Sequence, residues 1–400
     1  MEQHQSALAL VLARQPELPV QALRPHAAEN AAREFVSGFA GEVFYAVKAN
    51  PSPVILDAIY RGGVRRFDAA SLPEIEAVAT RFPDASIAFL HPIKSPRAIA
   101  RAYFELGVRV FALDSVAELE KIKRATGGAR DLQLIVRLAA DSRHAQHKLG
   151  GKFGVSGRAA AELLRATRGV ADELGVSFHV GSQCMAPSAY ADAMARAGAT
   201  IRAAGATVDI VDVGGGFPCR YPDLAPPPLA DFLSVIAAAF EEMPVLENAD
   251  LWCEPGRALC AEAGAQIVRV EGRKGNSLYL NDGAYGSLFD AAHTGLIYPV
   301  ARLGADTGAP LEPFEFYGPT CDSLDHMPGP FYLPADTKAG DYLEIGQTGA
   351  YSAALRTQFN GFGAEETVIL RDAPLIRRQD DQTDPVYLPA ANDPIARIVE

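Results

Sequence analysis

The feature that most constrains this chain is an alternation of short apolar segments with segments of helical period, from about residue 43 to residue 253. Each apolar segment is rich in β-branched residues and ends in turn residues, as a buried strand does. Eight strands alternating with helices match a (β/α)8 TIM-like barrel in number and length. A doubly wound open sheet is the competing architecture, but the first strand-to-helix turn lacks a Gly-x-Gly-x-x-Gly pattern. The predicted strands are Val43–Val47, Val64–Ala69, Ser86–Leu90, Val108–Leu113, Gln133–Leu138, Val176–Val180, Val208–Val213 and Asp250–Cys253.

The pattern changes after about Ala261. Segments of helical period almost vanish, and short strands separated by Gly and Pro follow, which is typical of an antiparallel β-domain. The sequence therefore predicts a barrel over residues 23–261 and a β-domain over residues 262–400, to which residues 1–22 contribute. The strands predicted in the β-domain are Gln266–Gly272, Ser277–Asn281, Phe314–Tyr317, Tyr342–Ile345 and Thr367–Leu370.

Composition excludes several classes of function. The chain carries 37 basic and 49 acidic residues, a net charge of −12, and no basic run, so nucleic acid and anionic membranes are poor partners. The start lacks a basic signal-peptide region, and the apolar run Ala7–Ala13 is too short to span a bilayer. Five scattered cysteines without a Cys-x-x-Cys pattern indicate neither a disulfide framework nor a zinc site. We expect a cytoplasmic protein without a metal.

The first predicted strand ends in a lysine, in the segment 44–50, Phe-Tyr-Ala-Val-Lys-Ala-Asn. Taken alone, Lys48 is better explained by an ammonium group that reaches water beside an apolar strand. In a barrel, however, chemistry lies where the strands end on the C-terminal face. There Lys48 can hold a cofactor as a Schiff base.

Three glycines, Gly214–Gly216, directly follow the seventh predicted strand, and Arg257 follows the eighth. Glycines let backbone N–H groups approach an anion, and phosphate sites in barrels are often built from these two loops. A tight turn is the alternative for the glycines, and a surface ion pair is the alternative for Arg257. Ser182, after the sixth strand, can add a hydroxyl donor.

Glu254 ends the eighth predicted strand, where an unpaired carboxylate would be costly. It can pair with Arg257, or it can keep a pyridine ring nitrogen protonated. His179 is placed to stack on such a ring, although a hydrogen-bonded core histidine is the usual alternative. A lysine for an aldehyde, a glycine cradle with Arg for a phosphate and a carboxylate for a ring nitrogen together indicate pyridoxal 5′-phosphate (PLP).

These residues resemble the motifs of the PLP-dependent ornithine/lysine/diaminopimelate decarboxylase family of fold type III, closest to its ornithine decarboxylase branch. The resemblance implies an alanine-racemase-like barrel plus β-domain. The motifs in the barrel are Tyr45-Ala-Val-Lys48-Ala-Asn, Phe67-Asp-Ala-Ala-Ser71, His179-Val-Gly-Ser-Gln183, Gly214-Gly-Gly-Phe-Pro218 and Glu254-Pro-Gly-Arg257. Those in the β-domain are Gly318-Pro-Thr-Cys-Asp-Ser323, Gly349-Ala-Tyr351 and Phe359-Asn-Gly-Phe362.

The resemblance also implies a role for each matching residue. Lys48, Glu254, His179 and Cys321 would be catalytic, with Cys321 as the proton donor after CO2 is lost. Asp322 would bind the distal ammonium of the substrate, and Phe359 would line its pocket. In this family the Cys-Asp pair reaches the active site of the other subunit, so an obligate homodimer is implied. The implied cofactor-binding residues are Lys48, Asp68, His179, Ser182, Gly215, Gly216, Glu254, Gly256, Arg257 and Tyr351.

The expected reaction is decarboxylation of L-ornithine to putrescine, with lysine as the closest rival substrate. Ornithine decarboxylases of the eukaryotic kind have a Tyr-Asp pair where this chain has His293-Thr294, with Asp290 slightly earlier, so a different diamino acid stays open. Lys148 stands where the family commonly has an Arg near the ring. Amino-acid racemisation would need a second base that the sequence does not offer. An inactive regulator of polyamine synthesis would be expected to have lost Lys48 or the phosphate motifs, and both are present.

Overall fold

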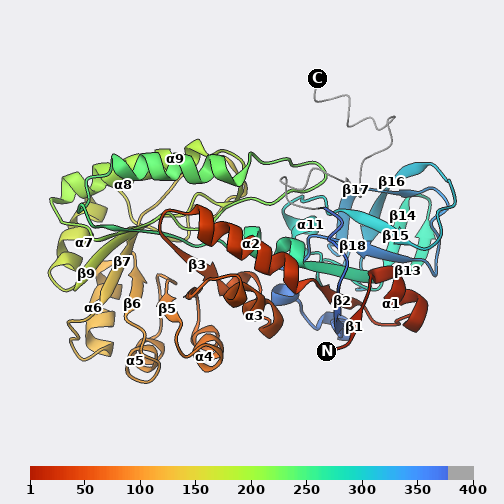
Figure 1. Ribbon diagram of the computed structural model, residues 1–400, viewed down its shortest axis with the longest axis horizontal. Coiled ribbons are helices and arrows are strands. Elements are labelled where there is room, and N and C mark those ends of the chain that lie inside the picture. Colours follow the sequence, from red (N-terminus) through yellow and green to blue (C-terminus); the bar gives the residue numbers. More distant parts are fainter. Residues whose placement is uncertain (377–400) are drawn as a thin grey trace. The chain divides into compact units, whose positions relative to one another are not determined.

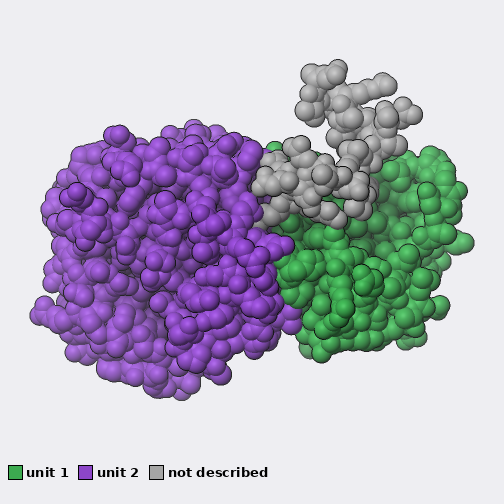
Figure 2. Space-filling model, in the orientation of Figure 1, with its two compact units in different colours: residues 1–27, 220–225, 261–400 green, residues 28–219, 226–260 purple. Residues whose placement is uncertain are grey.

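The computed structural model describes residues 1–376, which form two compact units (Figures 1 and 2). One unit comprises residues 28–219 and 226–260, and we call it the barrel unit. The other comprises residues 1–27, 220–225 and 261–376, and we call it the β-unit. No helix in this described part of the chain is long and apolar enough to cross a membrane.

The barrel unit is built on eight parallel strands that close into a barrel in the order β11-β12-β3-β4-β5-β6-β7-β9. The predicted TIM-like barrel is therefore confirmed. Its interior is filled by apolar side chains, with the rings of Phe44 and Trp252 only 4.6 Å apart. The strands are β3 (Glu42–Ala46), β4 (Arg66–Ala69), β5 (Ser86–Phe89), β6 (Val110–Leu113), β7 (Gln133–Arg137), β9 (Glu173–Ser177), β11 (Ile210–Asp212) and β12 (Asp250–Cys253).

Helices lie on the outside of these strands (Figure 1). Several begin at a serine whose hydroxyl accepts a hydrogen bond from the backbone N–H three residues later, as Ser71, Ser95 and Ser115 do. These serines follow the strands within a few residues, so they determine where each strand-to-helix loop ends and the next helix begins. The helices are α2 (Pro25–Gly38), α3 (Pro53–Arg61), α4 (Leu72–Arg81), α5 (Pro96–Phe104), α6 (Val116–Ala125), α7 (Gly157–Arg168), α8 (Ser188–Ala204), α9 (Leu229–Glu241) and α10 (Arg257–Cys260).

The sixth barrel strand differs from its prediction. It was expected at Val176–Val180, but β9 spans Glu173–Ser177, so His179 and Val180 lie in the loop beyond it. The loop is as apolar as the strand, and Phe178 and Val180 are fully buried, which is why periodicity placed the strand too late. Beyond it, the short strands β8 (Ala145–His147) and β10 (Ser182–Cys184) pair with each other.

The β-unit contains a nine-stranded sheet. Most strand pairs are antiparallel, as predicted, but β1 and β2 both run parallel to β19, and β14 runs parallel to β16. The predicted β-domain is thus confirmed, although its sheet is mixed and not purely antiparallel. The strands are β1 (Gln3–His4), β2 (Val20–Leu23), β13 (Gly264–Lys274), β14 (Ser277–Leu280), β15 (Val300–Leu303), β16 (Leu311–Tyr317), β17 (His326–Pro334), β18 (Tyr342–Ile345) and β19 (Glu366–Leu370).

The core of the β-unit lies between this sheet and α1 (Ala7–Arg14). Buried Arg24, just after β2, binds Glu344 of β18 at 2.7 Å and Asp372 beyond β19 at 2.8 Å. A buried arginine needs such paired acids, because burial removes the water that would otherwise solvate its charge. The first residues of the chain are therefore part of this sheet.

Candidate active site

Lys48 and Asp68 meet at the C-terminal end of the barrel strands. Lys48 lies in the single turn η1 (Val47–Ala49) directly after β3, and Asp68 lies in the neighbouring β4. The Lys48 Nζ to Asp68 Oδ2 distance is 2.5 Å, and the Asp68 side chain is only 1% exposed. Burial raises the pKa of Asp68 to about 6, and the charge of Lys48 opposes that rise. The ion pair holds the lysine amine at the strand ends.

The three glycines after β11 allow neighbouring loops to approach closely. A Cβ on Gly214 would lie 2.1 Å from the carbonyl oxygen of Phe178, and one on Gly216 would lie 2.2 Å from that of Gly181. A Cβ on Gly215 would lie 2.5 Å from the Glu254 carbonyl oxygen and 3.3 Å from His179 Nε2. Close approach of the backbone therefore explains all three glycines, and a single tight turn does not.

The backbone amides of Gly215 and Gly216 have no hydrogen-bond acceptor among the described residues, although both carbonyls accept bonds, from Tyr190 and Cys184. Gly215 is buried, and a buried N–H without an acceptor is rare. Nearby, Arg257 Nε donates to Ser182 Oγ at 3.3 Å, and Arg257 is only 4% exposed. Two amides, a hydroxyl and a guanidinium are the donors that an anion such as phosphate needs.

Glu254 is buried directly after β12, and its Oε1 has no hydrogen-bond partner in the described structure. Burial, followed by the charge of Asp212, raises the pKa of Glu254 to about 8. Both effects favour the protonated carboxyl, which can give its proton to a basic nitrogen placed against it. No ion pair between Glu254 and Arg257 is found among the described residues.

His179 lies between these groups. Its Nδ1 accepts a hydrogen bond from the Gly181 N–H at 2.9 Å, which places the ring proton on Nε2. Burial, with the charges of Arg137 and Lys48, holds the pKa of His179 well below its usual range. The ring is therefore neutral, and it is held against Gly215 of the glycine loop.

Arg137 and Asp212 are two charged residues of this site that the sequence analysis missed. Arg137 ends β7, and its charge acts on Asp68, His179 and Glu254. Lys148, which stands where the family commonly has an Arg near the ring, is exposed in the loop after β8. The signal for Arg137 was its place at the end of an apolar strand, the same signal that identified Lys48.

The β-unit brings together Cys321, Asp322 and Phe359. The Tyr285 hydroxyl donates to Asp322 Oδ2 at 2.5 Å, and the Tyr285 and Phe359 rings are 5.1 Å apart. The N–H of Cys321 donates to the Asn360 side chain at 3.0 Å. Hydrogen bonds from the Leu324 N–H and Tyr285 lower the pKa of Asp322, so this carboxylate is ionised and oriented for a cation.

Three other predicted residues of the β-unit lie near these loops in sequence. Tyr351 adopts a positive φ of 55° after Gly349, whose N–H binds the Ala261 carbonyl at 3.0 Å. His293 is exposed at the end of α11 (Phe289–His293). The Thr294 hydroxyl donates to the Asp290 carbonyl at 2.7 Å, and Asp290 is buried. Thr294 therefore uses its hydroxyl within its own helix end.

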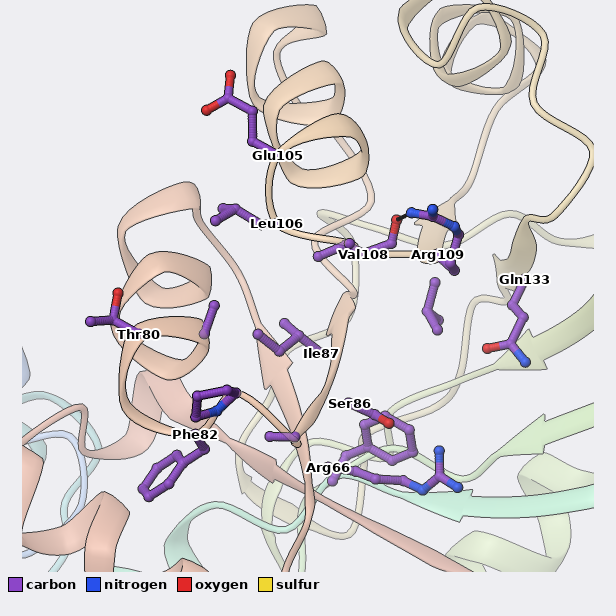
Figure 3. A pocket seen from close by; sticks show the side chains of 16 residues that line it. Arg66, Thr80, Phe82, Ser86, Ile87, Glu105, Leu106, Val108, Arg109 and Gln133 are labelled. Carbon is purple, nitrogen blue, oxygen red and sulfur yellow. Dashed lines mark hydrogen bonds between the residues drawn. The ribbon is translucent and has the colours of Figure 1, made fainter.

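A pocket with a volume of about 520 Å³ lies at the opposite end of the barrel, among the N-terminal ends of the strands (Figure 3). Arg66 and Arg109 at its rim bind the carboxylates of Glu42 and Asp131, both at 2.7 Å. Because these charges are already paired, the pocket lacks the converging groups seen at the C-terminal strand ends. All eight strands run in the same direction, and Lys48 follows the C-terminal end of β3, so this pocket lies at the end of the barrel away from Lys48.

Gly215→Ala tests the packing of the glycine loop. We expect cofactor affinity to fall by about tenfold or more, because overpacking at a buried site costs roughly 1–3 kcal/mol. Quenching of the fluorescence of Trp252, the single tryptophan, would measure cofactor binding two residues from Glu254. Gly169→Ala is the matched control, since its Cβ would meet no atom closer than 3.6 Å. Unchanged affinity in Gly215→Ala would remove this loop from the cofactor site.

Comparisons with known proteins agree on one group. Residues 26–261 match the family described as pyridoxal-dependent decarboxylase, pyridoxal binding domain. The chain is 32% identical over 358 residues to a lysine/ornithine decarboxylase of Selenomonas ruminantium, covering 87% of this chain and 88% of that protein. It is also 32% identical over 351 residues to antizyme inhibitor 2 of Xenopus laevis, covering 80% and 73%. The arginine decarboxylase of Paramecium bursaria Chlorella virus, solved with agmatine bound, superposes with a TM-score of 0.80 at 26% identity, covering 90% and 98%.

Proposed function

The chain belongs to the family of pyridoxal-dependent decarboxylases, and on that premise we propose that it decarboxylates L-ornithine to putrescine and CO2. As a member it is a PLP-dependent carboxy-lyase that acts on a basic amino acid. The ornithine substrate, the residue roles, the homodimer and a cytoplasmic location are our proposals. The single observation that carries the residue roles is the meeting of Lys48, Glu254 and two backbone amides without an acceptor among the described residues at one end of one barrel.

The residues present fit the cofactor. Gly215 and Gly216 offer amides without an acceptor in the described structure, and Ser182 and Arg257 lie beside each other as further phosphate donors. Glu254 offers a buried carboxyl oxygen without a partner. We assign the phosphate to these donors with Gly256 and Tyr351, the ring nitrogen to Glu254, one ring face to His179 and the aldehyde carbon to Lys48. Asp68 holds the Lys48 amine in place.

In the proposed reaction the chain's residues bind, orient and move protons. The bound cofactor supplies an electron sink for the electron pair of the breaking bond to the carboxylate. Glu254 keeps the ring nitrogen protonated, and Arg137 balances the negative charge around it. Asp322 binds the distal ammonium of the substrate, and Phe359 packs along its methylenes. The Cys321 thiol then gives its proton to Cα.

Ornithine is placed first because the motifs resemble the ornithine decarboxylase branch most closely and because Asp322 supplies one oriented carboxylate for the distal amine. The second acid of that branch is missing, since Thr294 stands in its place. A pocket discriminates one methylene by only about 1–3 kcal/mol, so lysine is the alternative substrate. Other diamino acids rank after lysine as candidate substrates.

The test is a parallel product assay. Purified, PLP-loaded protein would be offered ornithine, lysine, arginine, diaminobutyrate and diaminopimelate, and amines would be identified by mass spectrometry. We expect putrescine as the dominant product. Cadaverine as the dominant product would replace ornithine by lysine. No amine or CO2 from any of them would favour an inactive regulator, which the similarity to antizyme inhibitor 2 makes the second candidate.

The proposed homodimer is supported by the surroundings of Cys321. The thiol is exposed in the single chain, whereas a thiol that returns a proton to carbon needs a site closed to water. Large apolar side chains are exposed beside Cys321 in sequence and in the segment 355–362, whose Asn360 side chain accepts a hydrogen bond from the Cys321 N–H. Groups of exposed apolar side chains mark interaction surfaces. The side chains here are Leu324 (65% exposed), Leu355 (41%), Phe359 (45%) and Phe362 (44%). A second copy of the chain would cover them.

A further inference from the structure

Two buried carboxyl groups lie side by side in the barrel interior. Asp212 ends β11 and pairs with Trp252 of the parallel neighbour β12, two residues before Glu254. Since side chains alternate along a strand, Glu254 points to the same face as Trp252, which lies in the barrel core. Gly214 joins the two: its N–H donates to Asp212 Oδ1, and its carbonyl accepts from the Glu254 N–H, both at 2.8 Å.

No cation is bound directly to either carboxyl group in the described residues. Asp212 is fully buried, and its Oδ2, like Glu254 Oε1, has no hydrogen-bond partner apart from the other carboxyl. The charged groups that act on the two are Lys48, Arg137 on β7 and Asp68, which binds Lys48 and raises the pKa of Asp212 further. Two further titratable neighbours are neutral: burial raises the pKa of the Cys253 thiol, and burial holds the pKa of His179 well below its usual range.

Two adjacent buried carboxyls cannot both ionise without a large repulsion. We propose that Asp212 and Glu254 share one proton, and that Asp212 is a positioning residue which keeps this proton on Glu254 for an incoming ring nitrogen. The positioning role of Asp212 toward a ring nitrogen rests on the proposed function, whereas the shared proton does not. The rise in the pKa of Glu254, caused by burial and then by Asp212, agrees with this arrangement.

The proton balance of cofactor entry follows. Glu254 would give its proton to the ring nitrogen of a bound cofactor and would become the carboxylate that holds the resulting N–H. Before entry, the negative charge of Asp212 holds the proton on Glu254, because it raises the proton affinity of its neighbour. After the transfer, that charge would be offset by the positive ring. No proton from solvent is needed for this step.

Asp212→Asn isolates the charge of Asp212. Asparagine keeps an oxygen for the Gly214 N–H and gains an amide that can donate to Glu254, so both contacts survive without the acid. Asp209→Asn is the matched control: Asp209 precedes the same strand at its other end and binds Arg168 and the Leu174 N–H. It changes one aspartate without touching the pair.

The first measurement is infrared spectroscopy of the cofactor-free protein over a pH series. We expect a carbonyl band of a protonated carboxyl at pH 7 in the wild type and in Asp209→Asn, and its loss in Glu254→Gln. In Asp212→Asn the pH midpoint at which the band disappears should fall by about one unit or more, because a like charge has been removed. An unchanged midpoint, or no band in the wild type, would overturn the shared proton whatever the substrate is.

The second measurement is calorimetry of PLP binding at pH 7 in buffers of different ionisation enthalpy. PLP binding to Asp212→Asn should take up more protons from solvent than binding to the wild type, by up to one per site, because Glu254 then has no proton to give. Asp212→Glu should restore the wild-type number of protons. Equal proton uptake in all three proteins would overturn the delivery of the proton from Glu254. A purely structural role of Asp212 would change affinity and leave the proton count unchanged.

Discussion

Replacing Lys48 with alanine is expected to abolish the near-visible absorbance band that a lysine-linked pyridoxal cofactor adds to the protein. Activity should fall by more than about 10⁴-fold, as it does when a group that forms the covalent bond to a substrate or cofactor is removed. The Lys48 amine is held at the C-terminal ends of the strands by the buried acid Asp68. Absorbance spectra of the PLP-loaded variant and its turnover of ornithine measure both effects.

Lys123→Ala is the matched control, because Lys123 lies on α6 in the same unit and, within residues 1–376, its amine pairs with Glu120 alone, at 2.8 Å. Its spectrum and turnover should equal those of the wild type. The alanine at position 48 also frees Asp68, whose pKa should rise further above its present value of about 6 once the ammonium is gone. A Lys48→Ala protein that keeps the band would mean that another lysine holds the cofactor.

The barrel could be predicted because its signals are local. Short β-branched segments between helical ones determine strand number and order, and serine caps such as Ser71 mark the starts of helices. The boundary of β9 could not be predicted, because the loop that carries His179 is as apolar as the strand before it. That loop is buried by the glycine loop of β11, a contact between residues distant in the sequence.

The site was predicted in part for the same reason. Lys48 and Glu254 stand out because a charge at the end of an apolar strand needs an explanation, and Arg137 and Asp212 carried the same signal without being recognised. Cys321 and Asp322 had no such signal: alone, a cysteine and a turn aspartate suggest little. Only their resemblance to family motifs identified them, and their roles depend on a second subunit that no local pattern describes.

Mixing subunits tests that dependence. Lys48→Ala and Cys321→Ala should each be nearly inactive alone, and co-expression of the two should restore activity. If sites are shared, a mixed dimer has one site that carries both substitutions and one that carries neither. Random pairing makes half of the dimers mixed, so activity should reach about one quarter of the wild-type value per site.

The control combines Lys48→Ala with Glu254→Gln. Both residues lie in the barrel unit, so each site of a mixed dimer keeps one lesion, and co-expression should restore nothing beyond the sum of the two backgrounds. Restoration in the first mixture alone therefore requires that Cys321 serves a barrel other than its own. If the first mixture stays inactive although mixed dimers are isolated by two affinity tags, each chain completes its own site. The exposed apolar side chains around Cys321 would then need another explanation.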